Sequence, residues 1–112
     1  MWVNGNRLTR LDGLDSNFRL KVLFAHDNKI ATLKDSSVGS MTFLNTLNLS
    51  GNRLSDFKLT LEVLGRQMHL HDLDLSGNPI AEEKDYRLHV IKTMPWLHVL
   101  DKHKVRLPRV TP

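Results

Sequence analysis

A spacing of leucines and asparagines that recurs along the chain constrains its fold more than any other feature of the sequence. The pattern Leu-x-x-Leu-x-Leu-x-x-Asn-x-Leu fits residues 20–30, 44–54 and 70–80, with alanine or isoleucine in place of some leucines. The leading positions 20, 44, 70 and 97 are 24, 26 and 27 residues apart, a period typical of repeated units that stack into one elongated domain. Incomplete copies stand at the two ends: Val3, Asn6 and Leu8 at the first, and Leu97 and Leu100 at the last.

Each position of the pattern has a physical reason. Side chains alternate across a strand with a period of two, so the alternating leucines point to one side and form the core. The asparagine follows the strand, where its amide can bond the backbone groups of its own and neighbouring turns. We therefore predict a structural ladder of four buried asparagines: Asn6, Asn28, Asn52 and Asn78.

This spacing resembles that of the leucine-rich repeat family, and the resemblance covers nearly all of the chain. It implies an α/β solenoid, a curved right-handed superhelix with a parallel sheet on the concave face and short helices or 3₁₀ turns on the convex face. We expect the repeats to occupy residues 1–80. On the convex side, residues 8–14 and 59–68 carry apolar side chains at helical spacing, and Met68 is expected in the core.

A C-terminal cap is expected over residues 81–105, because the last repeat of a solenoid exposes its core to water. Glu82 and Glu83 favour the start of a helix, and Pro95 ends it. The segment is similar to the cap of intracellular leucine-rich repeat proteins of the phosphatase-regulator type. The residues that carry this similarity are Tyr86 and Arg87, Pro95 and Leu97, and Leu100 and Asp101. Residues 106–112 are expected to form a basic, flexible tail.

The first copy of the repeat begins in the middle, with no capping segment before Trp2. We expect either a longer protein of which this chain is a part, or a short isoform, as a monomer, with an open sheet edge that is prone to self-pairing. A preceding segment would cover Trp2 and Phe24, whereas without one these aromatic rings are available to a partner.

The sequence offers no group of residues that would make an enzyme. Because the chain contains no cysteine, a disulfide frame and a cysteine-based zinc site are excluded, and a reducing compartment fits best. His69 and His71 have the spacing of a two-histidine ligand pair, but no third ligand matches it. His89 and His98 lack the nearby serine, cysteine or paired acid that a nucleophilic site requires. We predict a non-enzymatic protein without cofactor or metal.

The function is therefore expected in a surface that binds another protein. The resemblance implies an adaptor or scaffold role, since family members regulate a phosphatase, join spliceosomal particles or attach to axonemal dynein and other ciliary machinery. Residues between the repeat leucines form columns on the concave face, aromatic toward the first strands and acidic toward the last. The predicted partner-binding residues are Trp2, Val22, Phe24, His26, Thr46, Asn48, Asp72, Asp74 and Asp101.

The positive charge of the chain supports an alternative class of partner. The net charge is +4 and the sequence pI about 9.7, and the last residues are rich in lysine and arginine. A nucleic-acid-associated or ribonucleoprotein subunit that uses this tail is the alternative. We favour protein binding because Asp72 and Asp74 on the concave face would repel phosphates.

The expected location follows from what the first residues lack. They contain no continuous apolar stretch of the kind that a signal peptide or a membrane span requires. We expect no membrane partner and an intracellular protein, in the cytoplasm, with the cilium and the nucleus as the alternatives.

Overall fold

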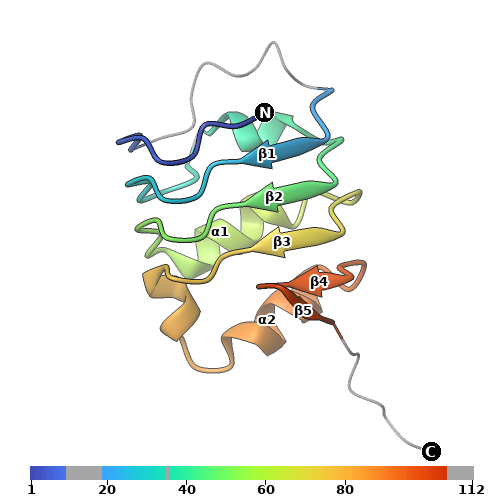
Figure 1. Cartoon of the computed structure of the whole chain (residues 1–112). Helices are drawn as coiled ribbons and strands as arrows, with labels where there is room; N and C mark the ends of the chain where they lie inside the picture. The colour runs from blue at the N-terminus through green and yellow to red at the C-terminus, as the bar shows by residue number, and fades with distance from the viewer. Residues whose placement is uncertain (10–18, 35, 106–112) are drawn as a thin grey trace, which may run out of the picture.

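The computed structural model describes residues 1–9, 19–34 and 36–105. Short strands lie side by side and short helices connect them (Figure 1). In chain order the elements are β1 (Val22–Phe24), the 3₁₀ helix η2 (Ser37–Ser40), β2 (Thr46–Asn48), α1 (Phe57–Leu64), β3 (Asp72–Asp74), the 3₁₀ helix η3 (Pro79–Glu82), α2 (Tyr86–Thr93), β4 (Val99–Leu100) and β5 (His103–Lys104).

The strands form one sheet in the order β1-β2-β3-β4-β5, and the first four are parallel. Their register follows the repeat, so that Leu23, Leu47, Leu73 and Leu100 stand opposite one another. The incomplete first copy joins the same sheet, because Trp2 forms a parallel bridge with Phe24 of β1. This parallel sheet with short helices between its strands confirms the predicted solenoid.

The core consists of the leucines of the repeat and their substitutes. At these positions of the three complete copies every side chain except Leu20 is at most 1% exposed. Burying one such side chain stabilises the fold by roughly 1.5–3 kcal/mol. The repeat therefore sets the register of the strands and supplies a large part of the core that holds them together.

Helix α1 begins earlier and ends earlier than the sequence predicted. The Asp56 side chain accepts a hydrogen bond from the Leu59 N–H (3.1 Å) and so caps the helix one residue before Phe57. The helix ends at Leu64, and Met68 lies beyond it with 68% of its surface exposed. The expectation that Met68 packs in the core was wrong. The other predicted convex segment, residues 8–14, lies mostly outside the described residues.

Asn52 shows how the turns of adjacent repeats are joined. Its Nδ2 donates to the carbonyl oxygen of Leu49 (2.9 Å) in its own repeat and to that of Ala25 (3.1 Å) in the preceding repeat. Its Oδ1 accepts from the Ile30 N–H (3.1 Å). One buried side chain thus satisfies backbone groups of two neighbouring repeats.

Asn28 and Asn78 make the equivalent bonds, but Asn6 does not. Asn6 is exposed and donates only within its own turn, to the carbonyl oxygens of Val3 (3.0 Å) and Asn4 (3.4 Å). The prediction of a buried rung at Asn6 does not hold, because no carbonyl of a preceding repeat lies against it in the described part of the chain.

The C-terminal segment covers the last repeat through side chains of helix α2. The Tyr86 hydroxyl donates to Oδ2 of Asp101 (2.9 Å), and the ring is only 9% exposed. Nη1 of Arg87 donates to the Leu100 carbonyl (3.0 Å), and its Nη2 reaches the carbonyls of β5. Helix α2 therefore holds β4 and β5 by side-chain bonds as well as by packing.

Helix α2 starts later than Glu82 and Glu83 suggested, because η3 comes first and the helix begins only at Tyr86. It ends at Thr93, two residues before Pro95, and Leu97 beyond it is buried. The proposed basic tail, residues 106–112, lies outside the described residues.

Candidate functional site

The sheet register places the predicted partner-binding residues in two columns. Val22, Thr46 and Asp72 stand opposite one another at the first strand position. Phe24, Asn48 and Asp74 do so at the third. The repeat leucines between them point into the core, so both columns lie on the outward face of the sheet.

The beginning of this face is aromatic. Trp2 stacks on Phe24 with ring centroids 4.1 Å apart and an interplanar angle of 28°, and His26 meets Phe24 edge-on at 6.4 Å. Trp2 is 70% exposed, the largest exposure among the bulky apolar residues described. Rings held against each other in this way are pre-ordered, so burying them against a partner costs little side-chain entropy.

The middle of the face is polar, and hydrogen bonds inside the protein hold the Asn48 side chain in place. Asn48 Oδ1 accepts from both the N–H and the hydroxyl of Ser50, at 3.0 and 2.8 Å. Val22, Thr46 and Asn48 are half-buried. They offer contact area of mixed polarity beside the rings.

At the acidic end, Asp74 is more deeply buried than the prediction of a partner-binding residue requires. Asp74 is only 4% exposed, and its Oδ1 accepts from the N–H and the hydroxyl of Ser76, at 3.1 and 2.6 Å. Its Oδ2 is also buried and has no hydrogen-bond partner in the described part of the chain. Asp74 faces outward, as predicted, but it is not accessible to a partner as an anchor.

Asp72 remains accessible at this end. It is half-buried, and burial, followed by repulsion from the Asp74 carboxylate, raises its pKa. A cationic group of a partner placed against Asp72 would relieve this repulsion. Asp72 is therefore the acidic residue of the face that is best placed to orient a partner.

Asp101 belongs to the cap and not to the open face. It has a positive φ of 52°, and its Oδ1 accepts from the Leu75 N–H (2.7 Å) while Oδ2 accepts from Tyr86. Burial raises its pKa, and these two hydrogen bonds oppose that shift. Both oxygens of Asp101 thus bond groups inside the protein, so its role in the cap is shown here, and its role in binding a partner stays a prediction.

His69 and His71, which have the spacing of a ligand pair, stack on different rings. His71 stacks on His98 with centroids 4.4 Å apart, whereas His69 stacks on Phe43 at 5.9 Å. No group of three potential metal-ligating side chains occurs within the described ranges. None of the described helices is long and apolar enough to cross a membrane.

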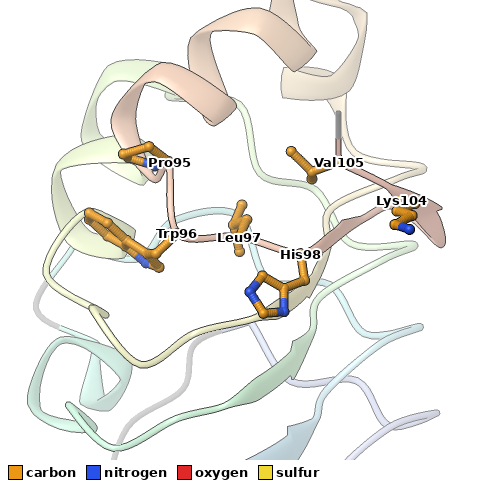
Figure 2. A pocket seen from close by; sticks show the side chains of 6 residues that line it. All are labelled: Pro95, Trp96, Leu97, His98, Lys104 and Val105. Carbon is orange, nitrogen blue, oxygen red and sulfur yellow. The ribbon is translucent and has the colours of Figure 1, made fainter. Parts of the chain in front are cut away.

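Sequence reasoning missed a second surface feature, at the edge of the sheet where the strands begin. An open hollow of about 340 Å³ lies there, and it is lined by Pro95, Trp96, Leu97, His98, Lys104 and Val105. Figure 2 shows the side chains of these six residues. The Trp96 indole donates to the Gln67 carbonyl (3.0 Å). Phe43, His69 and Trp96 each precede a leading leucine by one residue, so the repeat alignment itself contained the signal.

Comparison with known proteins agrees with this architecture. The family described as Leucine-rich repeat matches residues 2–110. The chain belongs to the leucine-rich repeat family. It is 33% identical over 102 residues to the U2 small nuclear ribonucleoprotein A' of Homo sapiens, with 91% of this chain and 40% of that protein covered. It is 36% identical over 102 residues to leucine-rich repeat-containing protein 23 of Bos taurus, with 91% and 29% covered.

Solved structures show the same fold. The Drosophila melanogaster SNF/U2A' complex contains a chain that matches with a TM-score of 0.80 and 28% identity, over 95% of this chain and 59% of that one. The Mex67 repeat domain of Chaetomium thermophilum matches with a TM-score of 0.68 and 27% identity, over 79% and 60%. The chain thus spans about two fifths or less of the curated relatives named above.

Proposed function

We propose that the chain is a non-enzymatic interaction module that binds a protein partner on its concave face, within an assembly of the ribonucleoprotein type. The observation that carries this proposal is the exposed Trp2 ring stacked on Phe24, at the beginning of the outward columns. A bulky ring that is 70% exposed contributes little to folding. Its burial against a partner would contribute directly to affinity.

The similarity to U2 small nuclear ribonucleoprotein A' supports the kind of assembly. The solved relative forms a complex with SNF, so a repeat domain of this shape accommodates a partner chain. These relatives favour the ribonucleoprotein members of the family over the phosphatase-regulator type that the cap residues indicated. The name of the U2 small nuclear ribonucleoprotein A' also favours the nucleus over the cytoplasm, and the name of neither relative supports a role in cilia.

The concave face is tested with variants of its two ends. Tagged protein is incubated with nuclear extract, and the retained proteins are compared between the parent and the variants Trp2→Ser, Phe24→Ala and Asp72→Lys. We expect the two ring variants to lose about 2 kcal/mol or more of binding free energy, which is about thirtyfold in affinity. Asp72→Lys should chiefly slow association.

Glu62→Ala is the matched control, because Glu62 is exposed on helix α1 of the opposite side. Asp74 is left unchanged, since a lysine at this buried position would disturb folding. Circular dichroism of each variant must match the parent before binding is compared. Full retention by all three concave variants, or a loss in Glu62→Ala as well, would contradict the proposal.

The net charge and the ribonucleoprotein relatives favour direct contact with nucleic acid as a second candidate function. This contact would rest on the basic residues near the end of the chain, where each neutralised phosphate adds a salt-dependent term. We expect retention on immobilised RNA to fall steeply between low and physiological salt, and replacement of Arg106 and Arg109 by serine to flatten that dependence. Retention that is absent at low salt would remove this candidate.

A further inference from the structure

Ring-bearing side chains gather along the edge of the sheet where the strands begin. We call this surface the aromatic ledge and define it as Phe43, Met68, His69, His71, Trp96 and His98. Backbone bonds hold its turns together: the His71 N–H donates to the Asn45 carbonyl (2.9 Å), and the His98 N–H to the His71 carbonyl (2.8 Å). The ledge therefore crosses three successive repeats as one continuous surface.

Four rings of the ledge are stacked in pairs, and two of its apolar side chains remain open to solvent. The pairs Phe43–His69 and His71–His98 are each stacked, with interplanar angles of 18° and 7°. Phe43 is 47% exposed and Met68 is 68% exposed. These are two of the four large apolar side chains that are exposed in the described residues. Their gathering at one place is unusual for surface that only contacts water.

The charge of the ledge has one sign. The turns along this edge are residues 42–45, 66–71 and 95–98, which carry the ledge side chains, and residues 19–21 next to them. They contain no aspartate or glutamate, and Asp72 follows directly after His71. The exposed cations Lys21 and Arg66 lie in these turns, and Lys104 borders the hollow beside Trp96 (Figure 2). The outward columns differ in charge, because they carry the acidic residues Asp72 and Asp74. The ledge is thus complementary to an anionic partner, and the concave face is not.

We propose that the aromatic ledge is a second docking surface, for a short acidic peptide segment with apolar side chains. Exposed Phe43 and Met68 supply apolar contact, and methionine adapts its shape to different partners. Lys104 and Arg66 pair with the carboxylates and speed the encounter. A protein segment fits better than single-stranded nucleic acid, since bases need free ring faces, whereas four of the five rings are already stacked on each other.

A displayed library of random short peptides tests the ledge directly, because it samples acidic and apolar segments in every order. The library is first depleted on the double variant Phe43→Ser/Met68→Ser and then selected on the parent protein. Both side chains are exposed, so the variant should keep the parent's circular dichroism and melting midpoint. We expect the recovered peptides to be rich in aspartate and glutamate around at least one aromatic residue or leucine.

One recovered peptide is then synthesised and titrated against purified variants. We expect the double variant and Lys104→Glu each to weaken binding about tenfold, and Trp2→Ser on the concave face to leave it unchanged. Because Trp2→Ser alters only the concave face and the double variant only the ledge, a failure of the ledge is distinguished from a failure of the proposed function. Recovery of no peptides, or of peptides without excess acid, would overturn the proposal. So would an oligothymidine that binds the parent and is released by the double variant, since that result assigns the ledge to nucleic acid.

Discussion

Replacing Asn52 by leucine is expected to lower the free energy of unfolding by about 2–4 kcal/mol, although leucine is close to asparagine in size. The Ile30 N–H loses its only hydrogen-bond acceptor among the described residues, and a buried unsatisfied donor costs roughly 1–3 kcal/mol. The carbonyls of Ala25 and Leu49 lose one bond each but keep another, from Asn28 and from the following rung of the ladder. Each of these two losses adds only roughly 0.5 kcal/mol, the lower end for a net hydrogen bond, because the carbonyl stays bonded.

Asn6→Leu is the matched control, since the residue occupies the same repeat position but is exposed and bonds only to its own turn. We expect its effect to remain within about 0.5 kcal/mol. In thermal melts the Asn52 variant should fall by about 10 °C and the control by at most a few degrees. Equal midpoints for the two variants would show that the asparagines do not join the repeats.

The repeat predicts well on which face of the sheet a side chain lies, because side chains alternate along a strand between only two faces. It predicts less well how far a side chain is buried, as Asp72 and Asp74 show. Both face outward, yet the Ser76 hydroxyl folds back onto Asp74 and the neighbouring residues cover it, whereas Asp72 stays accessible. Burial of an outward residue depends on side chains that are distant in space from the leucines of the pattern. A period in the sequence does not encode them.

The repeat pattern also did not predict the boundaries of the helices or the polar residues that are buried between the strands. Gln67 is fully buried because its Nε2 donates to the Val38 carbonyl (2.6 Å), which is 29 residues away in the sequence. This bond fixes the turn after α1, and Met68 then points to solvent instead of the core. Local spacing alone favoured the opposite arrangement. Met68 and His69 of the aromatic ledge lie in this same turn, so local spacing did not predict their exposure.

The cap is the second place where one substitution should have a large effect. Tyr86→Ala is expected to lower the free energy of unfolding by about 3–5 kcal/mol, because a large buried ring is lost. The ring contacts Phe57 of helix α1, with centroids 5.7 Å apart, as well as bonding Asp101. Its loss therefore separates the cap both from the last repeat and from the convex layer.

Tyr86→Phe divides this effect into its parts, since it keeps the ring and removes only the hydroxyl. Asp101 would retain the Leu75 N–H but lose a donor to a carboxylate whose burial is already unfavourable. We expect a loss of about 2 kcal/mol, as for other hydrogen bonds to charged groups. Leu88→Ala, at an exposed position of the same helix, should change the melting midpoint by at most a few degrees. Urea unfolding and gel filtration provide the measurement. An alanine variant as stable and as monomeric as the parent would mean that the last repeat does not need helix α2 to cover it.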